Sequence, residues 1–332
     1  MIQLAEFSLT KVKQLKSTKI WKKISLLFPF SCLFIVFGFL LLIANVVKPN
    51  SVFIVEKNLV LGFDELLPPP KPYPVNKGAA VLPELTAKSV VIQDIDSSVI
   101  LYQREPDLRL FPASTTKMMT GLVAYEAYPL NEILTVGEIK MDGNRINLVF
   151  GEQITVENLL YGLLVGSGND AAEVLGANYP GGMSAFILAM NKKAVDLKLT
   201  NTNFTNPIGL DEVNHYSSAL DLARLAGYLT NNQVLAKIVS TPEITITDVS
   251  GAIKHTLKNT NELTGKVDGV KGVKTGWTKN AGECLVTFVE KDGRKIIISL
   301  LGSGNRFGET QKLIDWVFNN FEWKVIVPSS YR

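Results

Sequence analysis

The chain has 332 residues, which is enough for one large domain with appendages or for two modest domains. Its 46% hydrophobic composition allows a sizeable core, and the formal net charge is only +3. No basic patch interleaved with aromatic residues follows the lysine-rich N-terminus, so we do not expect a nucleic-acid partner.

Residues 24–47, ISLLFPFSCLFIVFGFLLLIANVV, contain no charged side chain. A helix of this length, at about 1.5 Å rise per residue, reaches across the hydrocarbon core of a bilayer, so we predict a transmembrane anchor. The alternative is a cleaved signal peptide. Its apolar region would run roughly 7–15 residues and end in a small-x-small site, to which LIANVV is a poor match.

Residues 1–23 carry lysines at positions 11, 13, 16, 19, 22 and 23, with only Glu6 against them. By the positive-inside rule this segment is a basic cytoplasmic tail. We therefore expect a single-pass protein of the cell membrane, with everything after the anchor extracytoplasmic. Cys32 lies in the anchor and Cys284 far along the chain, so we expect no disulfide between them.

Residues 48–86 are predicted to form an extracytoplasmic linker. Five prolines between positions 68 and 74 favour an extended and fairly stiff spacer. The apolar stretch 52–63 within it is too regular for a simple linker, and a short strand or a docking segment is the only account that the sequence offers.

Residues 87–325 are predicted to form one folded domain. Two β-rich runs on either side of DIDSS indicate a hairpin over 88–104, and three strands are expected late in the chain, at 270–278, 283–290 and 294–302. Helical periodicity occupies the middle and the end of the domain, at 114–125, 154–179 on both sides of a glycine turn, 181–197, 217–232 and 310–321. Strands at both ends with helices between them imply an α+β fold, with an antiparallel sheet flanked by helices, and disfavour a doubly wound parallel sheet.

Three short motifs in this domain could carry chemistry. The first is Ser114-Thr115-Thr116-Lys117, in which serine and lysine stand one helical turn apart on one face. A serine hydroxyl becomes a good nucleophile when a neighbouring base removes its proton, and a lysine can do so if burial or a nearby cation makes it neutral. Taken alone, the motif is better explained by a helix cap beside a solvated lysine.

The second motif is Ser167-Gly168-Asn169, in the turn between two helical patterns. A hydroxyl and a carboxamide there could relay a proton and orient the lysine. Ser167 with Asp170 also has the spacing of a helix capping box. GSGNDA could be the G-x-G-x-x-A of a dinucleotide fold, but that needs an acidic residue about 20 positions further on, and none occurs there.

The third motif is Lys274-Thr275-Gly276, at the end of a predicted strand. The cation and the hydroxyl would suit a substrate carboxylate, and the glycine would let the substrate backbone approach the strand. A charge on Lys274 close to Lys117 would lower the pKa of Lys117 by like-charge repulsion. An exposed strand lysine before a turn would explain the motif without any function.

SxxK, SxN and KTG in this order and at these separations resemble the motif set of the penicillin-recognising serine enzymes. The similarity is closest to the D-alanyl-D-alanine carboxypeptidases, which are low-molecular-mass penicillin-binding proteins. It extends over most of residues 88–321 and includes FPASTTKMMTGLVAYE, GEQITVENLLYGLLVGSGNDAAEVL, FTNPIGL, HYSSALDLARLA and GVKTGWTKNAGECLVTF. The resemblance implies a β-lactamase/transpeptidase-like fold with a helical subdomain.

The resemblance also implies catalytic roles. Ser114 would be acylated, Lys117 would be the general base, and Ser167 with Asn169 would join the hydrogen-bond relay. The substrate-binding residues it implies are Lys274, Thr275, Gly276 and Trp277.

Lys274 and Thr275 would hold the carboxylate of the terminal D-alanine, and the backbone N–H groups of Ser114 and Trp277 would form the oxyanion hole. The implied partners are a peptidoglycan stem peptide ending in D-Ala-D-Ala and β-lactams as inhibitors. No metal or organic cofactor is implied. His215 and His255 have no ligand partner at metal-site spacing, and we expect a structural role for His215.

Two other functions stay open at this point. A serine β-lactamase would need a group that activates water against the acyl-enzyme, and no E-x-x-L-N string occurs between Asn169 and Lys274. A non-catalytic module that captures stem peptides or β-lactams would need no turnover. Several family members carry a second β-rich domain and an amphipathic C-terminal helix, whereas this sequence stops at Arg332, so we expect the N-terminal segment to provide the anchor.

Overall fold

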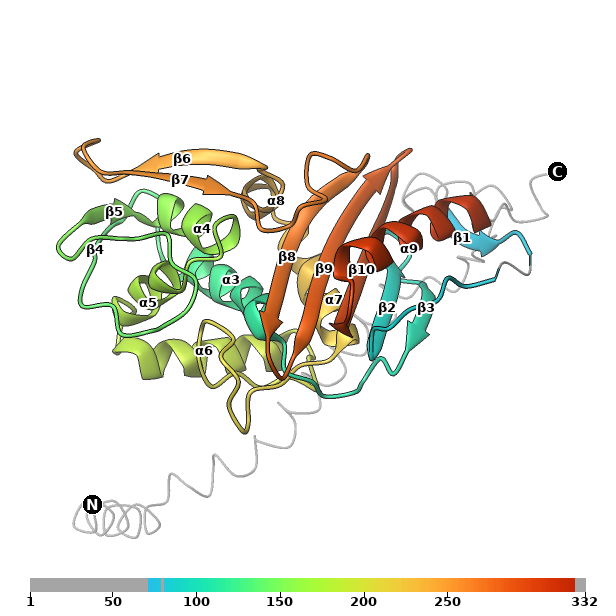
Figure 1. Cartoon of the computed structure of the whole chain (residues 1–332), viewed down its shortest axis with the longest axis horizontal. Coiled ribbons are helices and arrows are strands. Elements are labelled where there is room, and N and C mark those ends of the chain that lie inside the picture. Colours follow the sequence, from blue (N-terminus) through green and yellow to red (C-terminus); the bar gives the residue numbers. More distant parts are fainter. Residues whose placement is uncertain (1–70, 79–80, 326–332) are drawn as a thin grey trace, which may run out of the picture. The chain divides into compact units, whose positions relative to one another are not determined.

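A computed structural model of the chain describes residues 71–78 and 81–325 (Figure 1). These residues belong to one compact unit, Pro70–Arg332. The predicted tail 1–23, the predicted anchor 24–47 and the stretch 52–63 lie outside the described residues. Within the described part of the chain, no helix combines the length and the apolar character needed to cross a membrane.

The centre of the fold is a five-stranded antiparallel sheet in the order β3-β2-β10-β9-β8 (Figure 1). Its strands are β2 (Ser89–Asp94), β3 (Ile100–Arg104), β8 (Val270–Thr278), β9 (Gly282–Lys291) and β10 (Arg294–Ser303). Ile298 of β10 pairs with Ile92 on one side and Thr287 on the other, which joins the two ends of the domain. The prediction of an antiparallel sheet completed by distant segments is confirmed.

Strand β10 shows why the sheet is covered on both faces. Alternate side chains of a strand point to opposite faces. Ile296, Ile298 and Leu300 pack in the smaller core, with Leu313, Ile314 and Val317 of α9 (Arg306–Asn320), whereas Ile297 and Leu301 belong to the larger core on the other face. A continuous apolar run is expected where both faces of a strand are buried.

The other helices form the opposite layer and the helical subdomain (Figure 1). They are η3 (Ala113–Thr116), α3 (Lys117–Ala127), α4 (Val156–Leu164), α5 (Asn169–Ala177), α6 (Gly182–Asp196), α7 (Ala219–Thr230) and α8 (Gln233–Val239). Thr155 caps α4 by accepting from Asn158 N, and Ser218 caps α7 by accepting from Asp221 N. A side-chain acceptor satisfies one of the free N–H groups at a helix start, so these serine and threonine residues fix where the helices begin.

Three two-stranded sheets were not predicted. They pair β1 (Tyr73–Asn76) with β11 (Phe321–Lys324), β4 (Ile133–Thr135) with β5 (Gln153–Thr155), and β6 (Glu243–Thr247) with β7 (Lys254–Lys258). Strand β1 lies inside the segment that we predicted as a linker, so that part of 48–86 belongs to the folded unit. Proline is tolerated on a strand at a sheet edge, which is how Pro74 can lie in this one.

Candidate active site

Ser114 and Lys117 lie where η3 runs into α3, and they face each other. The distance from Lys117 Nζ to Ser114 Oγ is 3.0 Å, and Nζ also donates to Ile208 O at 2.9 Å. The side chain of Lys117 is fully buried, with 0% exposure. Neither η3 nor α3 has a side-chain cap, so the alternative of a capping serine beside a solvated lysine is wrong.

Burial changes the protonation of Lys117. Removing an ammonium group from water disfavours its charged form, and this lowers the pKa of Lys117 from 10.5 to about 7, although the charge of Asp170 acts in the opposite direction. A large fraction of the enzyme therefore carries a neutral amine at neutral pH. A neutral amine with its lone pair next to Ser114 Oγ can accept the serine proton.

Two glycines hold the nucleophile segment in position. Ala113 adopts a positive φ of 47° directly before Ser114. A Cβ on Gly209 would overlap the carbonyl group of Ala113, and a Cβ on Gly276 would lie 3.0 Å from Pro112 O and Ser114 N. Gly276 thus makes room for the segment that carries Ser114, and the room that we expected it to make for the substrate backbone stays a prediction.

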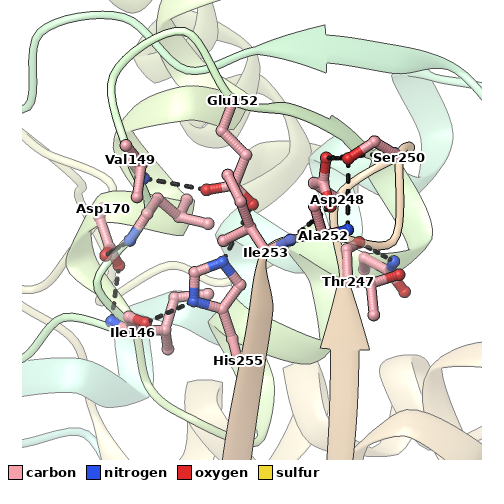
Figure 2. Close-up of polar contacts among 12 residues, drawn as sticks. Ile146, Val149, Glu152, Asp170, Thr247, Asp248, Ser250, Ala252, Ile253 and His255 are labelled. Carbon is pink, nitrogen blue, oxygen red and sulfur yellow. Dashed lines mark hydrogen bonds and ion pairs between the residues drawn. The ribbon is translucent and has the colours of Figure 1, made fainter.

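Ser167 and Asn169 lie in the turn between α4 and α5. The Ser167–Asp170 capping box is not formed, because α5 has Gly168 as its N-cap and no side-chain cap. Asp170 instead accepts from the backbone N–H of Ile146 at 3.1 Å (Figure 2). It also accepts from the backbone N–H of Leu148 at 3.1 Å. Ser167 has a positive φ of 56° and is buried.

Segment 142–149 supports this turn, and the sequence analysis did not identify it. Asn169 N donates to Asn144 O at 2.7 Å, and the Asn169 side chain donates to Asp142 O. Gly143 has φ +100°, and a Cβ there would lie 2.7 Å from Asn169 Nδ2. The Asp-Gly pair at 142–143 is a turn signal, but nothing in it indicates which residue the turn contacts.

Lys274 and Thr275 lie on β8 and share Thr260 as a partner. Lys274 Nζ donates to Thr260 Oγ1 at 3.3 Å, and Thr275 Oγ1 donates to the same oxygen at 2.8 Å. Thr260 has no motif that could have identified it. Lys274 is buried, and its pKa is held well below 10.5 by burial first and then by the charges of Lys117 and Arg306. Burial is the main cause that lowers the pKa of Lys117, and the repulsion that we expected between the two lysines is mutual, so it disfavours the state in which both are charged.

An open cleft of about 1030 Å³ connects Ser114 of the first motif with Asn169 of the second and with Trp277, which directly follows the third; Lys274, Thr275 and Gly276 do not themselves line it. Its lining includes Ser114, Asn144, Asn169, Asn206, Gly209 and Trp277. The Trp277 side chain is 64% exposed. Arg306, a further residue that the sequence did not indicate, donates from Nη1 to Gly276 O at 2.9 Å. Within the described residues, no hydrogen bond joins Ser167 or Asn169 to Ser114 or Lys117, so the expected relay is not closed.

His215 lies behind the nucleophile segment. Its Nδ1 accepts from Thr205 N at 3.1 Å, which leaves the proton on Nε2 to be donated to Thr116 Oγ1 at 2.9 Å. Burial lowers the pKa of His215 to about 4, so the ring is neutral at pH 7. These contacts agree with the structural role that we predicted. Over residues 71–78 and 81–325, no group of three or more His, Cys, Asp or Glu side chains could hold a metal ion.

Comparison with known proteins gives consistent similarities. A family model described as D-alanyl-D-alanine carboxypeptidase (peptidase S11) matches residues 76–305. The chain is 36% identical over 246 residues to the D-alanyl-D-alanine carboxypeptidase DacF of Bacillus subtilis, which covers 71% of this chain and 63% of the relative. It is 34% identical over 263 residues to a D-alanyl-D-alanine endopeptidase of Pseudomonas aeruginosa, and this match covers 75% of this chain and 81% of the relative.

A solved structure shares the fold. The crystal structure of the Streptomyces K15 DD-transpeptidase matches with a TM-score of 0.69 and 30% identity, over 72% of this chain and 100% of that chain. The chain spans less than two thirds of the length of the Bacillus relative but the whole of the Streptomyces chain.

Proposed function

Because the chain belongs to the D-alanyl-D-alanine carboxypeptidase family, we propose that it hydrolyses the D-Ala-D-Ala bond of peptidoglycan stem peptides through an acyl-enzyme on Ser114. One observation carries this proposal. A fully buried lysine with a pKa of about 7 lies 3.0 Å from the hydroxyl of Ser114, which is what a serine hydrolase needs when no histidine contacts its nucleophile.

Acylation begins with a proton transfer. Neutral Lys117 takes the proton of Ser114 as Oγ bonds to the carbonyl carbon of the penultimate D-alanine. Collapse of the tetrahedral intermediate breaks the C–N bond, and the proton passes from Lys117 to the amine of the departing D-alanine. Ile208 O, which accepts from Nζ, keeps the lysine amine directed at the serine in the free enzyme.

The substrate is held from the β8 side. Lys274 and Thr275 are suited to the terminal carboxylate, because a charge-assisted hydrogen bond to a carboxylate is about twice as strong as a neutral one. The N–H groups of Ser114 and Trp277 stabilise the oxyanion. Gly276 packs against Ser114 N, so β8 and the nucleophile segment approach closely enough for both donors to serve one oxygen.

Deacylation requires water to attack the ester carbonyl, which releases the shortened peptide and returns the proton to Ser114. We assign Ser167 and Asn169 to this relay and to orienting the Lys117 amine. β-Lactams would acylate Ser114 in the same way, with the ring C–N bond as the bond that breaks, and their acyl-enzymes would persist.

Release of D-alanine from a synthetic D-Ala-D-Ala peptide tests this function. The wild-type chain should release one D-alanine for each peptide that it cleaves, over many turnovers. Ser114→Ala should release none and should keep the wild-type melting temperature. If the wild type binds the peptide without releasing D-alanine, the protein is a binding module. If it releases no D-alanine but hydrolyses benzylpenicillin rapidly, it is a β-lactamase.

We also propose that residues 24–47 anchor the catalytic domain outside the cytoplasmic membrane. The support is the uncharged length of that segment and the lysines before it. Full-length protein should stay in bacterial membranes after a carbonate wash, and a variant without residues 24–47 should not. Mature protein that begins beyond residue 47 would show instead that the segment is a cleaved signal.

A further inference from the structure

The turn that carries Ser167 and Asn169 is bound to α4 by Gly168 N, which donates to Gly162 O at 2.9 Å, and further polar contacts come from segment 142–149. Ser167 has a positive φ, and the carbonyl groups of Gly166 and Ser167 accept from Asn144 Nδ2 at 2.7 and 3.0 Å. Asn169 in turn donates to the backbone of segment 142–149, at Asp142 and Asn144. The geometry of the turn therefore depends on where this segment lies.

Ile146 is the point at which segment 142–149 is packed onto the turn. A Cβ on Gly162, Gly166 or Gly168 would lie 2.5, 2.7 or 3.1 Å from the Ile146 side chain, so these three glycines make room for it. Its backbone N–H donates to Asp170 Oδ1. A small displacement of Ile146 would thus shift the residues at both ends of the turn, because tightly packed groups transmit strain.

The backbone of Ile146 is held from the other side by His255 on β7 (Figure 2). Its carbonyl oxygen lies 3.0 Å from His255 Nδ1, and a carbonyl can only accept, so Nδ1 carries a proton and donates. Nε2 lies 3.0 Å from Glu152 Oε1, and Glu152 Oε2 accepts from Val149 N at 2.9 Å. His255 and Glu152 are 6% and 4% exposed, so water cannot easily replace either contact.

Hydrogen bonds at the tip of the β6–β7 hairpin fix the position of β7, which carries His255. Asp248 accepts from the N–H groups of Ile253 and Ser250 at 2.9 and 3.1 Å, which closes the tip (Figure 2). Val249 N donates to Gln153 O at 2.8 Å, one residue after Glu152. These hydrogen bonds fix the position of the hairpin, and therefore of His255, relative to segment 142–149.

We infer that His255, supported by Glu152, is a positioning residue for the reaction: its contact to Ile146 O fixes segment 142–149 and thereby holds Asn169 at the active-site cleft and Ser167 in the same turn. This inference rests on the proposed function. Neither residue touches substrate or the reacting atoms, so both act through the backbone that they bind. Of the two contacts that His255 makes, the one to Ile146 O is the one that reaches the turn.

Two substitutions separate these contacts. The amide nitrogen of asparagine can occupy the place of Nδ1, so His255→Asn retains a donor for Ile146 O and loses the contact to Glu152. The amide nitrogen of glutamine reaches the place of Nε2, so His255→Gln retains the contact to Glu152 and leaves Ile146 O without its donor. Ile246→Ala is the matched control. Ile246 is the buried cross-strand partner of His255, so its truncation weakens the same hairpin but removes no hydrogen bond to segment 142–149.

The experiment measures kcat and KM for D-alanine release, together with the melting temperature, for the full-length wild type and the three variants. We expect His255→Gln to lower kcat roughly tenfold or more with KM within about twofold, because misplacing catalytic groups by about 1 Å costs up to a hundredfold. His255→Asn should stay within about threefold of wild type, and Ile246→Ala should lose melting temperature but not kcat.

Three results would overturn the inference while leaving the proposed function intact. The first is an unchanged kcat in folded His255→Gln. The second is an equal loss of kcat in His255→Asn and His255→Gln. The third is a loss of kcat in Ile246→Ala as large as that in His255→Gln. A wild-type protein that neither releases D-alanine nor reacts with benzylpenicillin would overturn the proposed function instead, and the inference with it.

Discussion

As Lys117 becomes neutral, the rate at which β-lactams acylate Ser114 should rise with pH with a midpoint near 7, and loss of the charge on Lys274, whose pKa burial also lowers, should end the rise. Burial lowers the pKa of Lys117 to about 7, and only the neutral amine can take the serine proton. At pH 8 about ten elevenths of the enzyme carries neutral Lys117, and at pH 6 about one eleventh does, as a single titration requires. Lowering the pH from 8 to 6 should therefore slow acylation roughly tenfold.

The assay is the second-order rate constant for labelling by a fluorescent penicillin, from quenched samples between pH 5.5 and 9. The carboxylate of the penicillin stays ionised over this range, so the enzyme alone determines the profile. Lys117→Met, which keeps the volume and removes the base, should lose at least a hundredfold at every pH, in line with the loss of a general base. A flat profile would refute the reasoning. So would a rate that keeps rising tenfold per unit above pH 8, as an ordinary lysine with a pKa of 10.5 would give.

Three further predictions concern the residues around the nucleophile. Lys274→Ala should raise KM for a D-Ala-D-Ala peptide at least tenfold, since a hydrogen bond to a charged group contributes about 1.5–3 kcal/mol; an unchanged KM would place the carboxylate elsewhere. Thr260→Val removes the oxygen that Lys274 and Thr275 share, and kcat/KM for the peptide should fall about tenfold at an unchanged melting temperature, whereas full activity would make that contact irrelevant. Gly209→Ala should lower the free energy of unfolding by roughly 2 kcal/mol or more in denaturant titrations, because φ is +87° and the new methyl would overlap Ala113; a stability equal to that of wild type would contradict the close approach.

Much of the fold could be predicted because its signals are local. The hairpin at β2–β3, the strands β9 and β10 with their turn, and the helix α9 each show periodicity within one segment. Their assembly into one sheet followed from strands at both ends of the domain. The hairpin β6–β7 was missed although its burial alternates, with His255 and Leu257 buried between exposed neighbours, because the segment is short and largely polar.

The site was predictable as a set of motif residues but not as a set of contacts. Ser114 with Lys117 and Lys274 with Thr275 could be found because each pair is close in sequence. Thr260, Asn144 and Arg306 contact these motifs from distant segments, and no local pattern marks them.

The same limit explains the alternatives that were wrong. The helix cap at Ser114 and the capping box at Ser167 were read from sequence neighbours alone. In the structure Lys117 and Asp170 contact segments more than 20 residues away.

The central claim, that Ser114 is an activated nucleophile, is tested most directly by the intact mass of the full-length protein after mixing with benzylpenicillin, followed by peptide mapping. Our account predicts an adduct of one penicillin per chain on the peptide that contains Ser114, and none with Ser114→Ala, which should otherwise fold normally. An adduct on another residue, or an adduct that forms equally in Ser114→Ala, would contradict it. Complete absence of an adduct with the penicillin recovered intact would do the same.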